Sequence, residues 1–132
     1  MQDYKTLAEA AAEAKTHSYS PYSKFRVGSA VLTDDGTLYK GTNIENASYG
    51  LAVCAERNAI FKAVYDGHKK IKAVAVTSDL EEYCPPCGAC RQVMAEFCGP
   101  DSDIVLVKNN GETSVYKFKD ILPLSFTQDF LQ

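Results

Sequence analysis

The sequence lacks an excess of positive charge, an apolar run long enough to span a bilayer, and any internal repeat. Its 132 residues contain 14 Lys and Arg against 17 Asp and Glu, a net charge of -3. Proteins that bind nucleic acids usually need a basic surface to neutralise phosphates, and a membrane helix needs about 20 apolar residues. We therefore expect neither a nucleic-acid-binding protein nor a membrane protein. The length fits a single domain, 1–132.

Histidine is scarce in this sequence, whereas cysteine is not. The two histidines, His17 and His68, have no neighbours of the kind that share a metal ion. The five cysteines are an odd number, and the N-terminus has no apolar leader segment. This combination favours reduced thiols over a disulfide framework, and we expect a cytoplasmic protein.

Hydrophobic periodicity predicts an alternation of helices and strands. The strand expected over 71–77 consists largely of alanine and valine, which is typical of a buried central strand. Turns of the Asp-Gly and Asn-Gly type at 34–36 and 109–111 predict hairpins. We therefore predict a five-stranded sheet with helices packed on it. The expected helices cover 4–16, 54–66 and 87 to about 99, and the expected strands cover 25–32, 38–43, 71–77, 103–107 and 114–118.

The most informative residues are Cys54, Cys87, Cys90 and Glu56. Three thiolates leave a tetrahedral zinc ion with one open position, and an open position distinguishes catalytic zinc from structural zinc. Glu56 follows the first cysteine by two residues, so its carboxylate can reach a water molecule at that position. The pattern predicts zinc-assisted hydrolysis.

Two other interpretations of the cysteines remain open at this stage. A Cys-x-x-Cys pair can be a redox pair, and Cys84 could complete a closed site of four cysteines. The two prolines at 85–86 favour an extended backbone after Cys84, which argues against the closed site. Cys87 and Cys90 instead lead into a predicted helix and should point the same way.

The predicted helices also affect the charge of the site. Both cysteine segments begin helices, where free N–H groups and the positive end of the helix dipole stabilise thiolates. Zinc with three thiolates carries a formal charge of minus one, which opposes ionisation of a bound water. Arg57, next to Glu56, is the expected source of compensating charge.

At this point the residues match a known pattern, in which a first ligand, a nearby Glu and a later Pro-Cys-x-x-Cys identify zinc-dependent deaminases. Cys-Ala-Glu-Arg-Asn-Ala-Ile at 54–60 and Pro-Cys-Gly-Ala-Cys-Arg-Gln-Val at 86–93 resemble the small homotetrameric cytidine deaminases of pyrimidine salvage. The resemblance extends through 21–25, 41–47 and 122–126, and it covers nearly the whole chain.

The resemblance implies a three-layer α/β cytidine-deaminase-like fold, with a five-stranded mixed sheet and helices on both faces. It implies hydrolysis of cytidine to uridine and of 2'-deoxycytidine to 2'-deoxyuridine, with release of ammonia. It also implies one zinc ion per subunit and a small-molecule nucleoside as the binding partner. Cys54, Cys87 and Cys90 correspond to the zinc ligands, and Glu56 to the proton shuttle. Arg57 corresponds to an arginine that offsets thiolate charge.

The resemblance also implies substrate contacts. Asn43 and Glu45 correspond to a pair that binds the ribose 3'-hydroxyl, and the Ala55 N–H to a donor for the base carbonyl. Phe25 and, from a neighbouring subunit of a homotetramer, Phe126 correspond to aromatic residues that pack on the pyrimidine. From position alone, Phe25 could simply begin a strand and Phe126 could be a core residue.

One segment departs from the family pattern, because Pro85 replaces the serine that usually precedes Pro-Cys. Proline still supplies a carbonyl acceptor, so we expect activity to survive. Three alternative functions remain. A nucleic-acid deaminase is disfavoured by the short hairpin at 109–111, an antibiotic nucleoside deaminase by the Asn-Ile-Glu-Asn segment at 43–46, and a structural zinc module by Glu56.

Overall fold

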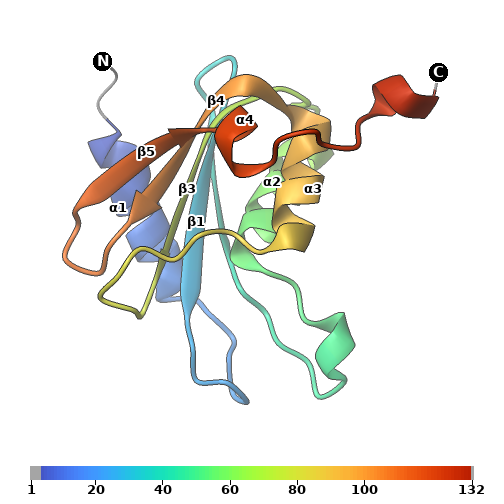
Figure 1. Ribbon diagram of the computed structural model, residues 1–132. Coiled ribbons are helices and arrows are strands. Elements are labelled where there is room, and N and C mark those ends of the chain that lie inside the picture. The colour runs from blue at the N-terminus through green and yellow to red at the C-terminus, as the bar shows by residue number, and fades with distance from the viewer. Residues whose placement is uncertain (1–3, 132) are drawn as a thin grey trace.

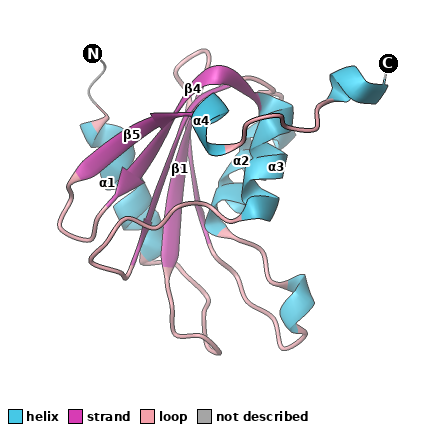
Figure 2. Ribbon diagram, viewed as in Figure 1, coloured by secondary structure: helices cyan, strands magenta, loops and turns pink. Residues whose placement is uncertain are grey.

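The computed structural model describes residues 4–131 as a mixed five-stranded sheet between two layers of helices. The strand order is β2-β1-β3-β4-β5. The β3–β4 pair is parallel and the other three pairs are antiparallel. Figures 1 and 2 show α1 separated from α2 and α3 by the sheet. The elements are α1 (Lys5–Lys15), β1 (Val27–Thr33), β2 (Leu38–Thr42), η1 (Tyr49–Leu51), α2 (Ala55–Tyr65), β3 (Ile71–Ser78), α3 (Gly88–Phe97), β4 (Cys98–Val107), β5 (Thr113–Lys117), α4 (Phe118–Ile121) and η2 (Gln128–Leu131).

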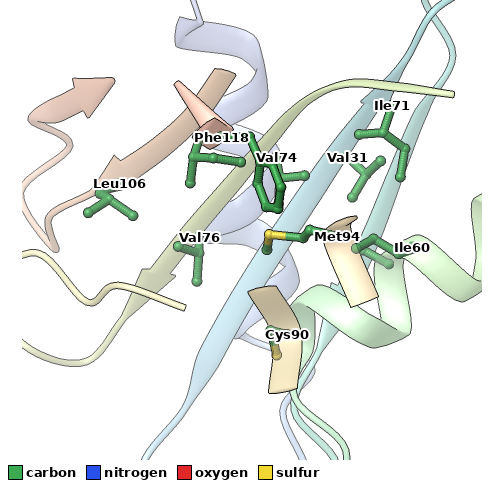
Figure 3. Close-up of a cluster of buried hydrophobic side chains, with 11 residues drawn as sticks. Val31, Ile60, Ile71, Val74, Val76, Cys90, Met94, Leu106 and Phe118 are labelled. Atoms are coloured by element: carbon green, nitrogen blue, oxygen red, sulfur yellow. The ribbon is translucent and has the colours of Figure 1, made fainter. Parts of the chain in front are cut away.

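The two faces of the central strand β3 pack against different layers. Ala73 and Ala75 pack with the α1 residues Leu7, Ala8 and Ala11. The intervening residues, Val74 and Val76, pack on the other face with Ile60 of α2 and Met94 of α3, as Figure 3 shows. Because successive side chains of a strand alternate between faces, burial on both faces favours consecutive apolar residues, as at 73–76 of β3. The predicted three-layer arrangement is therefore confirmed.

Two glycines set the distance between helices and sheet. A Cβ atom on Gly28 of β1 would lie 2.1 Å from the Ala11 carbonyl oxygen and 2.5 Å from the Lys15 nitrogen, both in α1. A Cβ atom on Gly41 of β2 would lie 2.4 Å from the Ala59 nitrogen in α2. The helices therefore rest directly on the strand backbones at these points.

We expect Gly28→Ala to lower the free energy of unfolding by about 3 kcal/mol or to prevent folding, because the clash is with helix backbone, which cannot rotate away. Urea unfolding followed by circular dichroism measures the change. Gly50→Ala is the matched control, since no atom lies within 4 Å of its added Cβ. Equal stability of the two variants would contradict the proposed contact.

Most predicted elements are present. Two strands begin two or more residues away from the predicted position, and the other ends differ by at most about two residues; Phe118, predicted in a strand, begins α4. The strand expected from Phe25 begins at Val27, because Lys24 has a left-handed backbone (φ 61°) and the Arg26 N–H donates to the Asp79 carboxylate at 3.0 Å. The strand expected from Asp103 begins at Cys98, directly after α3.

The early start of β4 depends on an irregularity in its pairing. Ile71 pairs with Cys98 and Ala73 pairs with Asp103, so the longer β4 segment bulges against β3. The buried Ser102 hydroxyl stabilises the bulge by donating to the Ile71 carbonyl at 2.7 Å and accepting from the Gly99 N–H at 2.9 Å. Gly99 and Pro100 therefore lie inside a strand rather than in the helix stop that we predicted.

The connection between α1 and β1 and the connection between β2 and α2 both extend beyond the end of the sheet at which α2 and α3 begin (Figure 1). A bridge between Tyr19 and Ile44 joins the α1–β1 connection to the β2–α2 connection, and a bridge between Ile44 and Val53 lies within the second of them. None of the helices within residues 4–131 has both the length and the apolar character that crossing a bilayer requires.

Candidate active site

Three cysteine thiols meet where α2 and α3 begin. Cys54 is the residue that caps the N-terminus of α2, Cys87 caps α3, and Cys90 lies in the first turn of α3. The Sγ atoms of Cys54 and Cys87 are 3.7 Å apart, those of Cys87 and Cys90 are 3.4 Å apart, and all three lie within 4.8 Å of one another. Thiolates bound to one tetrahedral zinc ion at about 2.3 Å lie ~3.8 Å apart. The spacing and the soft sulfur donors therefore fit zinc.

Cys84, the residue that could have completed a closed site of four cysteines, lies outside this group. Cys84 is partly buried, and its Sγ atom lies 3.9 Å from the Pro85 carbonyl oxygen. Burial raises the pKa of its thiol. Three cysteines without a fourth leave one tetrahedral position open for a ligand that the protein does not supply.

Positive charge reaches the thiols from α2. Arg57 donates from Nη2 to Cys54 Sγ at 3.5 Å. In the metal-free cluster, a hydrogen bond from Cys90, followed by that from Arg57, lowers the pKa of Cys54 to about 5. The Nε atom of Arg57 is buried and has no hydrogen-bond partner among the described residues. The Nη2 hydrogen bond thus places the guanidinium beside Cys54, and the role of Arg57 in compensating thiolate charge stays a prediction.

Glu56 is the buried carboxyl group beside the cysteines. It lies in the first turn of α2, and only 3% of its surface is exposed. Burial raises the pKa of its carboxyl to about 7, because an ionised carboxylate is costly in an apolar environment. A carboxyl group with a pKa near neutrality can both accept and donate a proton at physiological pH.

A cavity of about 320 Å³ joins the cysteines to the predicted substrate-binding residues. This volume is at the lower end of the range for small-molecule sites. The residues that line the cavity are Ser23, Phe25, Val27, Asn43, Ile44, Glu45, Ala52, Val53, Cys54, Ala55, Glu56, Val76, Cys84, Pro85 and Cys87. Seven of the predicted site residues are therefore brought together, whereas Phe126 is not.

The side chains of Asn43 and Glu45 are already engaged with the neighbouring loop. Asn43 donates from Nδ2 to the Phe25 carbonyl at 2.9 Å and accepts from the Val27 N–H at 2.9 Å. Glu45 accepts from the Tyr22 and Ser23 N–H groups, each at 3.1 Å, and from the Ser23 hydroxyl. Besides facing the cavity, both residues hold its wall in place. Sequence reasoning included Ser23 in a motif but gave it no role.

Ala55 and Phe126 occupy different environments. Ala55 is fully buried. Because it is the first residue of α2, its N–H has no acceptor within the helix. Phe126 is 56% exposed, and its ring stacks on that of Phe130 with centroids 5.7 Å apart. Its carbonyl oxygen accepts a hydrogen bond from Gln92 Nε2 at 2.8 Å. Phe126 thus lies outside the cavity of its own chain, and Figure 1 shows that the C-terminal segment extends away from the sheet.

Comparisons with known proteins agree with this geometry. Residues 1–108 match the family model described as the cytidine and deoxycytidylate deaminase zinc-binding region. The chain is 46% identical to a cytidine deaminase of Halalkalibacterium halodurans over 96% of both chains. It is 45% identical to that of Sporosarcina psychrophila, over 98% of this chain and 95% of the relative.

Solved structures give the same result. The crystal structure of a cytidine deaminase from Burkholderia pseudomallei superposes with a TM-score of 0.90 at 43% identity, covering 95% of this chain and all of that one (100%). Sequence, fold and the grouping of three thiols with a buried carboxyl therefore agree, and the chain belongs to the family of zinc-dependent cytidine and deoxycytidylate deaminases.

Proposed function

We propose that this protein hydrolyses cytidine and 2'-deoxycytidine to uridine and 2'-deoxyuridine with release of ammonia, as a single-domain cytoplasmic enzyme of pyrimidine salvage. The observation that carries the proposal is the cavity in which the buried Glu56 carboxyl and two of the three clustered cysteines, Cys54 and Cys87, face a space large enough for a small ligand. The two relatives described above are named cytidine deaminases, and the similarity to this chain covers almost the full length of each.

Cys54, Cys87 and Cys90 would hold the zinc ion, which supplies Lewis-acid activation of the attacking water. Glu56 accepts a proton as that water adds to C4 of the pyrimidine, and delivers a proton to N3. Glu56 then accepts the proton of the hydroxyl added at C4 and transfers it to the amino group, so that the bond between C4 and the amino nitrogen breaks, ammonia leaves and the C4 carbonyl forms. A carboxyl group that must change its protonation state several times in one turnover works best with a pKa near the ambient pH, and burial brings the pKa of Glu56 to about 7.

The other residues of the cavity orient the nucleoside in this proposal. Phe25 packs on the pyrimidine, and the Ala55 N–H donates to the base carbonyl. Asn43 and Glu45 bind the 3'-hydroxyl with the hydrogen-bonding capacity that their loop contacts leave free. These assignments are supported by the shared position of the four residues, which line the same cavity as Glu56.

Charge favours a nucleoside over a nucleotide as the substrate. The described residues that line the cavity include two carboxyl groups, Glu45 and Glu56, and no Lys, Arg or His. A phosphate monoester carries close to two negative charges and needs cationic partners or clustered N–H donors. We therefore propose that deoxycytidylate, the other substrate in the family description, is a poor substrate for this chain.

The decisive experiment measures zinc per chain and ammonia release on one preparation. Cytidine, 2'-deoxycytidine and deoxycytidylate serve as parallel substrates. We expect one zinc ion per chain, turnover of both nucleosides, and little turnover of the nucleotide. A zinc-loaded protein that releases no ammonia from cytidine would overturn the proposed function, and preferential use of deoxycytidylate would overturn the proposed substrate class.

We also propose a homotetramer in which Phe126 completes the cavity of a neighbouring subunit. The support is the C-terminal group of exposed apolar residues Leu124, Phe126, Phe130 and Leu131, whose relative exposures range from 56% to 103%. Monomeric proteins seldom expose large contiguous apolar patches.

Phe126→Ala should raise the Michaelis constant for cytidine by about tenfold to a hundredfold, since burying a phenylalanine contributes about 1.5–3 kcal/mol. Steady-state kinetics and sedimentation velocity measure the effect and the assembly. Tyr116→Ala, which removes an exposed aromatic residue of β5, is the matched control. A fully active monomer would exclude a shared site.

A further inference from the structure

Ser23 lies at the rim of the cavity with its hydroxyl between two predicted substrate-binding residues. The hydroxyl donates to one carboxylate oxygen of Glu45 and accepts from the Phe25 N–H at 3.0 Å. A serine hydroxyl has one donor and two acceptor positions, so its single proton is committed to Glu45. Ser23, Phe25 and Glu45 all line the cavity.

The backbone between Ser23 and Phe25 needs this support. Lys24 has a φ of 61°, a left-handed conformation that residues other than glycine rarely adopt. The Ser23 hydroxyl bridges Lys24 by binding the N–H of Phe25, two residues after Ser23, as serine side chains do in turns. On the other side, the Lys24 N–H donates to the Ser20 carbonyl at 3.0 Å. The hydroxyl is thus part of what holds this turn in its unusual conformation.

Phe25 is fixed from both directions by the predicted ribose pair. Its N–H reaches Glu45 through the Ser23 hydroxyl, and its carbonyl accepts from Asn43 Nδ2 at 2.9 Å. The second oxygen of Glu45 remains bound to the N–H groups of Tyr22 and Ser23. The Ser23 hydroxyl therefore links Glu45, the predicted sugar contact, to Phe25, the predicted base contact.

We propose that the Ser23 hydroxyl is a positioning group, which sets the Glu45 carboxylate and the Phe25 ring in the orientation that binds the nucleoside. The proposal rests on the proposed function, because it takes Glu45 and Phe25 as substrate contacts. Ser23 acts before the chemical step, so its loss should weaken binding much more than it slows turnover of bound substrate.

Ser23→Ala removes the hydroxyl and keeps the backbone N–H that binds Glu45. We expect the Michaelis constant for cytidine and the dissociation constant for the product uridine to rise about tenfold or more, equivalent to ~1.4 kcal/mol or more and typical of a lost hydrogen bond to a charged group. The turnover number should change less than threefold, and zinc content should not change. Ser23→Thr, which restores the hydroxyl on an exposed residue, should recover most of the affinity. Ser20→Ala, a serine in the same turn whose hydroxyl accepts from Ser18, is the matched control.

A second arm tests the coupling through Glu45. With 3'-deoxycytidine, which lacks the hydroxyl that Glu45 would bind, the penalty of Ser23→Ala should be smaller than with cytidine. Parent-like binding of cytidine and uridine by Ser23→Ala would overturn the inference, as would failure of Ser23→Thr to recover affinity or an equal penalty with the two nucleosides. If the parent zinc enzyme releases no ammonia from cytidine, the proposed function itself fails, which is a different result from an active parent and an unaffected variant.

Discussion

Replacing Glu56 by glutamine should lower the turnover of cytidine by ~10²- to 10⁴-fold, the usual loss on removal of a general acid–base group. The amide has nearly the shape of the carboxyl group but cannot exchange protons with the water or with the pyrimidine. Because the side chain is 3% exposed, bulk solvent has little access to take over the transfer. Folding and zinc content should stay at parental values, since Glu56 is not one of the clustered thiols.

Single-turnover kinetics with cytidine, combined with zinc analysis of the same samples, measure this effect. Glu96→Gln, a glutamate of α3 that is exposed to solvent, is the matched control and should be fully active. Turnover of Glu56→Gln within a few-fold of the parent would remove Glu56 from the mechanism. Loss of zinc together with turnover would assign Glu56 to metal retention instead.

Replacing Cys87 by serine should weaken zinc binding by at least ~100-fold, because even partners that only support a ligand contribute 10- to 100-fold to metal affinity. Cys87 Sγ lies 3.7 Å from Cys54 Sγ and 3.4 Å from Cys90 Sγ. Activity with cytidine should fall in parallel with metal content. Competition against a chromophoric chelator provides the affinity.

Cys84→Ser is the informative partner of this variant. Cys84 is three residues from Cys87 and lines the cavity, yet it stands outside the group of thiols. Its replacement should change zinc affinity by less than threefold, under ~1 kcal/mol. Equal and large losses in the two variants would mean that Cys84 binds the metal, and the site would then be a closed structural one.

Much of the fold could be predicted because its signals are local. The periodicity of α1 and α2, the apolar run 73–76 of β3 and the turn at 109–111 each indicate their structure within a short window. The start of β4 could not be predicted in this way. Gly99 and Pro100 usually end elements, but here they lie in a strand because the Ser102 hydroxyl satisfies the distant Ile71 carbonyl. Such a contact depends on tertiary packing, which overrides local propensity.

One part of the candidate site could likewise be predicted from the sequence, and another part could not. The position of Cys87 and Cys90 at the start of a helix predicted that these two thiols point the same way, and the zinc-ligand pattern added Cys54. The structure brings the three thiols within 4.8 Å of one another. The work of Asn43 and Glu45 in holding the loop around Phe25 was not predictable, because each of those hydrogen bonds joins segments at least 16 residues apart. The roles of these residues toward a substrate stay predictions until the variants are measured.

The caps of α2 and α3 have a consequence for how the chain folds. Cys54 and Cys87 are 33 residues apart in sequence, and the segment between them includes β3, the strand at the centre of the sheet. An ion that binds both thiols in the folded chain therefore links the two ends of this segment. At a free zinc concentration of 100 times the dissociation constant, binding to the folded state alone adds ~2.7 kcal/mol to its stability. The lifetime of the folded chain is thereby tied to the supply of metal, so that a shortage of zinc would lower the amount of the protein as well as its activity.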